Sequence, residues 1–191
     1  TVMFFHGNGS AVYSGHDIYR TINAQGYGVF ALAYPGYPGR SGETTQDTLI
    51  RAAKDGYDFV IAQGVEANKL AFYGTSLGAG IAAQLSRERR PALIIMEAPF
   101  TSAADMAQLR FPIFPARILT KDKFDSVEAL AGSNIPLVWL HGTGDRVIPF
   151  SMGRDLYDGY DGPKTAYKIV AAGHNDLWQR GGQGIILSQL A

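Results

Sequence analysis

Six short apolar runs, rich in β-branched and aromatic residues, recur along this chain of 191 residues. They cover residues 2–5, 28–34, 69–73, 92–96, 136–141 and 165–170. Their apolar character is nearly continuous rather than alternating, which is typical of strands buried on both faces of a parallel sheet. The chain is therefore predicted to build a mostly parallel sheet that needs helices on both of its faces.

Stretches with helical spacing separate these runs, at residues 17–25, 45–63, 77–87, 152–160 and 175–190. Strands that alternate with helices along the chain are typical of an α/β fold. The longest gap between strands, residues 97–135, is predicted to hold a crossover helix and a small lid-like insertion at about residues 100–130. The length and the lack of linkers predict a single domain over residues 1–191.

Composition excludes several classes of function. The 17 Lys and Arg residues balance 17 Asp and Glu residues, and this zero net charge argues against a nucleic-acid partner. The lack of cysteine excludes disulfides, thiolate nucleophiles and cysteine-ligated metals. The four histidines are scattered, so no metal site is expected. No apolar run reaches the ~18 residues of a membrane-spanning helix.

The segment Gly74-Thr75-Ser76-Leu77-Gly78 directly follows the third apolar run and opens a helical stretch. Its G-x-S-x-G pattern predicts that Ser76 lies on a sharp strand-to-helix turn, with its hydroxyl exposed at the edge of the sheet. Such a strained turn requires small neighbours, which Gly74 and Gly78 supply. The alternative is a glycine-rich turn in which the serine has no chemical role.

A serine hydroxyl becomes a good nucleophile only beside a base, and the base needs an acid to orient it. His174 follows the last predicted strand, and Asp145 follows the preceding one. Because the carboxyl ends of parallel strands meet at one edge of the sheet, we expect both beside Ser76. Asp176 is the rival acid, but its closeness to His174 predicts that it caps the final helix or orders the loop. A surface histidine and a turn-forming aspartate remain the alternatives.

Attack on a carbonyl builds negative charge on its oxygen, which calls for nearby hydrogen-bond donors. The backbone N–H of Leu77 is one candidate, because it lies at a helix N-terminus. The backbone N–H of Asn8, in the loop after the first predicted strand, is the other. The alternative for this loop is a plain glycine-rich turn.

Together these motifs resemble those of the α/β-hydrolases, and the likeness runs from Thr1 to nearly the last residue. His6-Gly7-Asn8, the loop 34–41, the motif 74–78 and Gly173-His174-Asn175-Asp176 resemble the small ABHD-type serine hydrolases without a cap domain. Residues 100–102 and 123–126 are similar to that branch as well. The resemblance implies a serine esterase, thioesterase or lipase-like hydrolase that acts on a small-molecule or lipid-like acyl substrate without a cofactor.

The sequence departs from that family in lacking the two strands that usually precede the His-Gly loop. The run 28–34 is therefore expected to form an uncovered apolar edge, with poor solubility or edge pairing as the result. Members of the branch often carry an N-terminal membrane anchor, and membrane association through sequence upstream of Thr1 would suit the abrupt start. Localisation and oligomeric state stay open.

The apolar stretch 109–119 contains two prolines, which forbid one long helix. It is expected to form either a lid or acyl pocket that touches lipid, or a broken helix packed on the core. Phe100, Phe111 and Phe114 are the candidates for contact with the acyl group. The loop 35–42 is expected to be a mobile rim beside the oxyanion loop or an ordinary surface loop.

Three other functions have some support in the residues. A serine peptidase or amidase would use the same side chains, and a non-catalytic binding module would leave them idle. Residues 78–83 fit G-x-G-x-x-A, but the first glycine lies too far past the strand for a dinucleotide-binding turn.

His141 is expected to be a structural residue at a strand end rather than a ligand.

Overall fold

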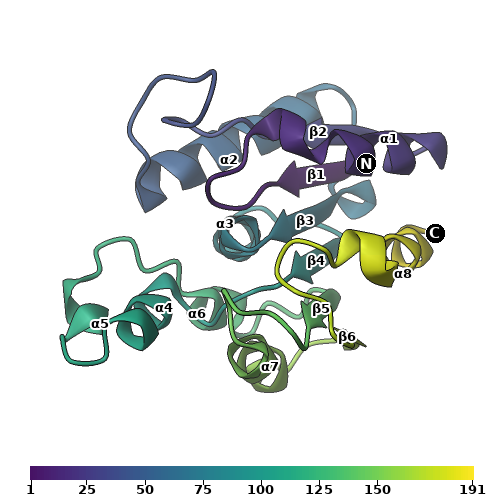
Figure 1. Ribbon diagram of the computed structural model, residues 1–191. Helices are drawn as coiled ribbons and strands as arrows, with labels where there is room; N and C mark the ends of the chain where they lie inside the picture. Colours follow the sequence, from purple (N-terminus) through teal and green to yellow (C-terminus); the bar gives the residue numbers. More distant parts are fainter.

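The computed structural model describes residues 1–191 and contains a parallel sheet of six strands (Figure 1). The strands are β1 (Val2–Phe5), β2 (Val29–Ala31), β3 (Ala71–Thr75), β4 (Leu93–Glu97), β5 (Leu137–Gly142) and β6 (Lys164–Ile169). Their order across the sheet is β2-β1-β3-β4-β5-β6, and every neighbouring pair is parallel. The predicted parallel α/β sheet is confirmed.

Helices connect the strands. They are α1 (His16–Ala24), α2 (Gln46–Ala62), α3 (Leu77–Ser86), α4 (Ala103–Arg110), α5 (Ala116–Leu119), α6 (Ser126–Leu130), α7 (Phe150–Gly159) and α8 (Gln183–Leu190), with the short turns η1 (Val12–Gly15), η2 (Ala67–Lys69) and η3 (Trp178–Gly182). Side-chain oxygens of Thr45, Ser102 and Asp125 cap α2, α4 and α6. The long helix predicted over 175–190 is wrong, because Gly181 takes a φ of 113° and separates η3 from α8.

The core has two layers, one on each face of the sheet. Met3 and Phe5 of β1 point into the larger layer, which α2, α3, α6 and α7 cover. Val2 and Phe4 point the other way, into the smaller layer beneath α1, η3 and α8. Successive side chains of a strand point to opposite faces, and both faces are covered here. This is why the strand sequences do not alternate between apolar and polar residues.

The strand β2 lies at the edge of the sheet and pairs with β1 alone. It has three residues, fewer than the apolar run 28–34 predicts, and all three are only partly buried. The sequence-based expectation of an edge strand at this position is thus confirmed.

The segment between β4 and β5 holds the three short helices α4, α5 and α6. Figure 1 shows α4 and α5 extending outward beyond the layers that cover the sheet. None of the helices in the structure combines the length and apolarity needed to cross a bilayer.

Candidate active site

Ser76 lies at the junction of β3 and α3 with φ 54° and ψ −116°, a backbone conformation that is strained for any residue with a side chain. A Cβ atom at Gly74 would collide with the backbone of Gly78, and one at Gly78 would collide with the carbonyl of Phe5. Both glycines are therefore required by close backbone approach. This is the sharp turn that the G-x-S-x-G pattern predicts.

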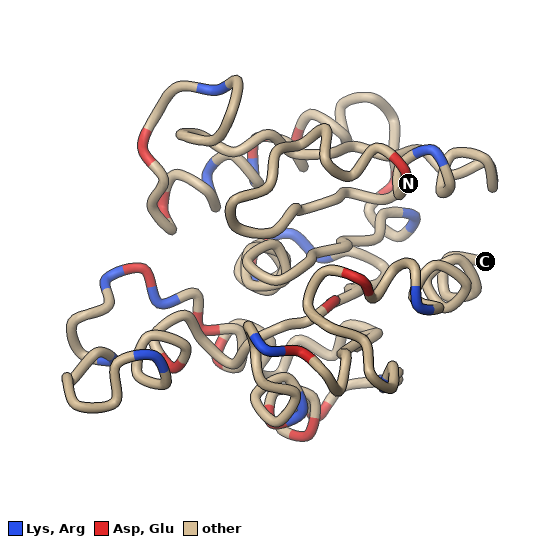
Figure 2. The backbone as a smooth tube through the Cα atoms, viewed as in Figure 1, with Lys and Arg blue, Asp and Glu red and all other residues tan.

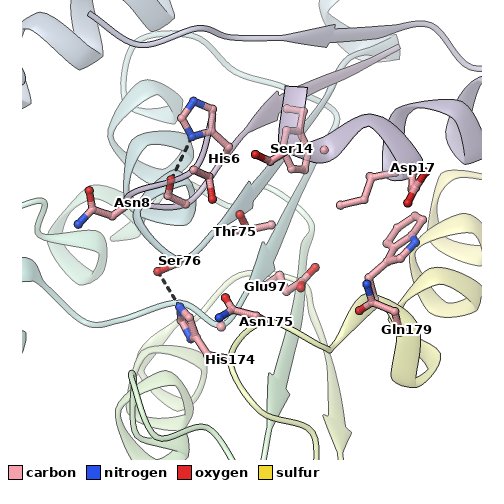
Figure 3. A pocket seen from close by; sticks show the side chains of 17 residues that line it. His6, Asn8, Ser14, Asp17, Thr75, Ser76, Glu97, His174, Asn175 and Gln179 are labelled. Atoms are coloured by element: carbon pink, nitrogen blue, oxygen red, sulfur yellow. Dashed lines mark hydrogen bonds between the residues drawn. The ribbon is translucent and has the colours of Figure 1, made fainter. Parts of the chain in front are cut away.

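The structure brings the three polar side chains singled out in the sequence into one hydrogen-bonded chain. His174 Nε2 lies 3.1 Å from Ser76 Oγ (Figure 3), and its Nδ1 lies 2.7 Å from Asp145 Oδ2. Because the carboxylate can only accept, Nδ1 carries the ring proton and Nε2 offers a lone pair to the serine hydroxyl. The imidazole is thus oriented to take the hydroxyl proton.

Asp145 is buried and stays ionised. Burial alone would raise its pKa, but hydrogen bonds from His141 and His174 and from two backbone N–H groups outweigh burial and lower the pKa well below its ordinary value. The backbone donors are Val147 and Ile148, at 2.8 Å and 2.9 Å from Oδ1. The carboxylate therefore keeps both its charge and its orientation at neutral pH.

His141 and Asp176 have the supporting positions that the sequence predicts. His141 is fully buried at the end of β5, with Nε2 3.1 Å from the carbonyl oxygen of Ile148. The same nitrogen lies 3.4 Å from Asp145 Oδ2, a contact that sequence reasoning missed. Asp176 accepts a hydrogen bond from the backbone N–H of Gly173 at 2.6 Å and pairs with Arg180, so it orders the loop that carries His174.

Two backbone N–H groups beside Ser76 are free to bind an oxyanion. Asn8 and Leu77 line a cavity together with Ser76, and neither N–H donates a hydrogen bond to another protein group. A Cβ atom on Gly7 would lie 3.5 Å from Ser76 Cβ, which shows how closely the loop after β1 approaches the serine. The arrangement fits the requirement for donors placed in advance of charge development.

The loop 34–41 lies beside the oxyanion loop, which is one of the two positions expected from the sequence, and is tied to it by hydrogen bonds that the sequence did not reveal. The hydroxyl of Tyr37 donates to Asn8 Oδ1 at 2.6 Å, and that of Tyr34 donates to the carbonyl oxygen of His6 at 2.9 Å. The rings of His6 and Tyr34 stack with centroids 4.0 Å apart. Burial lowers the pKa of His6, which keeps its ring neutral. The only signal in the sequence is the pair of tyrosines in the Tyr-Pro-Gly repeats of this loop.

Two cavities meet at Ser76 and Asn8. The first, here called the polar cavity, has a volume of about 240 Å³ and lies between the loop after β1, α1 and the segment 174–179 (Figure 3). The second, here called the apolar cavity, has a volume of about 320 Å³, and its lining includes Leu49, Leu77, Phe100, Met106, Phe124 and Ile148. No Lys or Arg lines either cavity.

Glu97, at the end of β4, lines the polar cavity and was not recognised from the sequence as part of the site. Its carboxyl is buried and accepts a hydrogen bond from the hydroxyl of Tyr73 at 2.5 Å. Burial raises the pKa of this carboxyl above its ordinary value. Its backbone carbonyl accepts a hydrogen bond from the N–H of Ser76 at 2.9 Å, which fixes the turn.

The three phenylalanines expected to contact the acyl group are separated in the structure. Phe100 lines the apolar cavity. Phe111 and Phe114 line neither cavity, and are 56% and 63% exposed. The physical reason is the pair of prolines at 112 and 115, which interrupt the helix between α4 and α5 and turn these rings outward. The stretch 109–119 is thus neither an acyl pocket nor a helix packed on the core, and the lid stays a prediction.

The site contains no group of three or more acidic, histidine or cysteine side chains close enough to hold a metal ion. The site presents a serine hydroxyl, an imidazole, a buried carboxylate and two backbone N–H groups. That combination is suited to nucleophilic attack on a carbonyl carbon.

Comparisons with known proteins identify a family and several relatives of this chain. The family model described as Serine aminopeptidase, S33, matches residues 1–123. An uncharacterized protein of Mycobacterium tuberculosis is 28% identical over 176 residues, which are 92% of this chain and 63% of that protein. Lysophosphatidylserine lipase ABHD12 of Rattus norvegicus is 28% identical over 177 residues, covering 82% of this chain and 44% of that protein.

Among solved structures, monoacylglycerol lipase of Paleococcus ferrophilus matches with a TM-score of 0.77 at 18% identity, over 99% of this chain and 93% of that one. This likeness concerns the fold. The chain spans roughly half to two thirds of the length of the two curated relatives. On the family match, the sheet and the relatives together, the chain belongs to the serine aminopeptidase S33 family of α/β-hydrolases and is of the ABHD type.

Proposed function

We propose that this α/β-hydrolase cleaves carboxylic ester or thioester bonds through an acyl-enzyme formed on Ser76. The observation that carries the proposal is the hydrogen-bonded chain from Ser76 through His174 to buried Asp145. The unpartnered N–H groups of Asn8 and Leu77 support it. A site that had lost its activity would have no physical need to keep all of these groups in this arrangement.

In the proposed first half-reaction, Ser76 Oγ attacks the carbonyl carbon while His174 Nε2 takes the hydroxyl proton. The oxyanion of the tetrahedral intermediate accepts hydrogen bonds from the N–H groups of Asn8 and Leu77. The intermediate collapses as the bond to the leaving group breaks, and His174 returns the proton to that alcohol or thiol. An acyl ester of Ser76 remains.

In the second half-reaction, a water molecule gives its proton to His174 Nε2 and attacks the acyl carbon. The second tetrahedral intermediate releases the carboxylic acid, and Ser76 regains its proton from His174. Asp145 stays ionised throughout and stabilises the imidazolium that forms in each half. Its strongly depressed pKa suits this role.

The two cavities suggest how a substrate is oriented. An acyl chain fits the apolar cavity, where its burial is favoured by the hydrophobic effect. The leaving group then lies on the polar side, where Glu97 and Asp17 are the acidic residues and no Lys or Arg is present. Uncharged polar leaving groups are therefore preferred over anionic ones.

Amide cleavage is the second candidate, because the family is described as a serine aminopeptidase. The same groups would act, and an acidic polar cavity could accept a substrate ammonium group. Esters remain the better match, because an alcohol or a thiol is a better leaving group than an amine and depends less on the proton that His174 returns. A non-catalytic binding module is the remaining alternative.

The test is a set of p-nitrophenyl esters, thioesters and anilides with matched acyl chains. We expect hydrolysis of esters and thioesters with kcat/KM at least about tenfold above that for the matched anilides. A preference for aminoacyl anilides would favour the peptidase. A folded chain that hydrolyses none of them faster than Ser76→Ala would favour the binding module.

A further inference from the structure

Six of the eleven large apolar side chains that are exposed lie within residues 109–119, at the end of α4, in α5 and between the two helices. We call this group the outer patch. It consists of Leu109, Phe111, Ile113, Phe114, Ile118 and Leu119, which are 53–92% exposed. Exposed apolar residues scattered singly need no explanation, but a group concentrated in one segment indicates an interaction surface.

The stretch from the end of α4 through α5 and into the following loop is basic. Residues 109–123 contain four basic residues, Arg110, Arg117, Lys121 and Lys123, against the single acid Asp122, a net charge of +3 in a chain whose total is zero. Arg117 is paired with Asp105, but Arg110, Lys121 and Lys123 form no ion pair. Figure 2 shows basic positions at α5 and in the loop that follows it.

Side-chain hydrogen bonds within this segment satisfy several of its backbone groups. The side chain of Gln108 donates hydrogen bonds to the carbonyl oxygens of Pro112 and Phe114, at 3.3 Å and 3.0 Å, and accepts one from the N–H of Arg117. The ion pair between Arg117 and Asp105 fastens α5 to α4. Because these backbone groups are satisfied within the protein, the outer patch can enter an apolar medium without leaving them unpaired.

We propose that residues 109–123 form a docking surface for anionic lipid bilayers. The apolar side chains would enter the boundary between headgroups and acyl chains, while the basic residues contact the negative headgroups. A second copy of the chain fits this surface poorly, because two patches face to face would bring together Arg110, Lys121 and Lys123 of both copies, none of which has an ion-pair partner. Charge complementarity therefore selects a negatively charged partner, and the exposed apolar side chains select a lipid one.

The outer patch belongs to a segment that also lines the apolar cavity. Met106 of α4 and Asp122 and Phe124 of the loop after α5 line the apolar cavity. A bilayer held against the outer patch thus lies beside that cavity. This last point rests on the proposed function, because it treats the cavity as an acyl site, whereas bilayer binding itself does not.

The test uses the Ser76→Ala chain, so that no lipid is hydrolysed, with vesicles of phosphatidylcholine alone or mixed with phosphatidylglycerol. Co-sedimentation is measured at about 0.1 M and about 1 M salt. Each basic residue near an anionic surface strengthens binding roughly fivefold. We expect binding to the mixed vesicles at least about tenfold tighter than to the neutral ones, and this preference should vanish at high salt.

Two sets of substitutions separate the apolar and basic contributions. Ile113→Asp with Ile118→Asp changes side chains that are 92% and 81% exposed, so folding should be retained, and binding to both kinds of vesicle should fall at least about tenfold. Lys121→Glu with Lys123→Glu should remove only the preference for anionic vesicles. Val170→Asp is the matched control, because Val170 is 72% exposed but lies just after β6, outside the outer patch.

The proposal is overturned if the folded chain binds neither kind of vesicle, or if Ile113→Asp with Ile118→Asp binds as well as Val170→Asp. It is also overturned if sedimentation velocity shows self-association that the Ile113 and Ile118 substitutions abolish, because the surface would then be covered by a second copy. Ester hydrolysis by the wild-type chain is measured separately in solution. Failure of docking therefore leaves the proposed function intact, and the reverse holds as well.

Discussion

The polar and apolar cavities share Ser76 and Asn8 but differ in everything else that lines them. The polar cavity presents Glu97, Asp17 and His174, whereas the apolar cavity is walled mainly by apolar side chains such as Phe100 and Met106. One reacting serine thus has a polar side and an apolar side. The difference suggests that a substrate is oriented by solvation, with its acyl chain on one side and its leaving group on the other.

The contrast follows from the two faces of the sheet. The apolar cavity opens above the larger core layer, and its residues Leu49, Phe100, Phe124 and Ile148 are themselves members of that layer. The polar cavity opens on the other face, between the loop after β1, α1 and the segment that carries His174. Loops rather than helix faces form most of its walls, so polar groups are tolerated there.

The largest effect is expected at the residue that both cavities share. Ser76→Ala should lower kcat for ester hydrolysis at least about 10⁴-fold, because no acyl-enzyme can form. Ser14→Ala is the control, since Ser14 lines the polar cavity only. Steady-state hydrolysis of a p-nitrophenyl ester measures both. Equal losses of kcat in Ser76→Ala and Ser14→Ala would contradict the assignment of Ser76 as the reacting serine.

The apolar cavity should control acyl-chain length. Met106→Asn places an amide among apolar side chains, and we expect kcat/KM for a long-chain ester to fall about tenfold while that for an acetate ester changes less than about twofold. Met152→Asn is the matched control, because Met152 is equally half-buried but lines neither cavity at Ser76. The same change in chain-length preference in both variants would contradict the assignment.

The hydrogen bond that supports the oxyanion loop should have a smaller effect. Tyr37→Phe removes the hydroxyl that donates to Asn8 Oδ1, and kcat should fall about three- to tenfold with little change in KM. Tyr13→Phe, at an exposed tyrosine, should behave as wild type. A change in KM alone would indicate that the loop positions substrate rather than the oxyanion donors.

Glu97→Gln should change hydrolysis less than the other substitutions do, and its main effect should be on stability. The folded-state pKa of Glu97 is raised by burial, so its contribution to stability is present below the unfolded pKa of ~4.3 and is lost as pH rises through the folded pKa. Glutamine can still accept the hydrogen bond from Tyr73. In urea unfolding, wild type should therefore lose stability relative to Glu97→Gln as pH rises above about 4.3. A difference in unfolding free energy between the two proteins that does not change with pH would contradict a buried carboxyl.

Much of the fold and the order of the site residues could be predicted from local sequence. Continuous apolar runs define the strands, and the pattern around Ser76 fixes a turn whose geometry depends on two glycines. Asp145 and His174 follow from chain order, because parallel strands end at one edge. These inferences use only residues that are neighbours in sequence or share a topological rule.

What could not be predicted depends on tertiary contacts. The bond between Tyr37 and Asn8 and the contact between His141 and Asp145 join residues whose partners no local pattern identifies. Glu97 reads as an ordinary strand residue until its burial is known. Phe111 was expected at the acyl group because it is apolar, but the backbone turn at the prolines decides which way its ring points.

The most direct test of the account is covalent labelling with a fluorophosphonate, read by intact mass. This reagent reacts with an activated serine, so the wild-type chain should gain one adduct, as should Ser14→Ala. Ser76→Ala and His174→Ala should gain none, because the first lacks the nucleophile and the second lacks its base. An adduct that persists in Ser76→Ala, or a folded wild-type chain that remains unlabelled, would contradict the claim that Ser76 is an activated nucleophile.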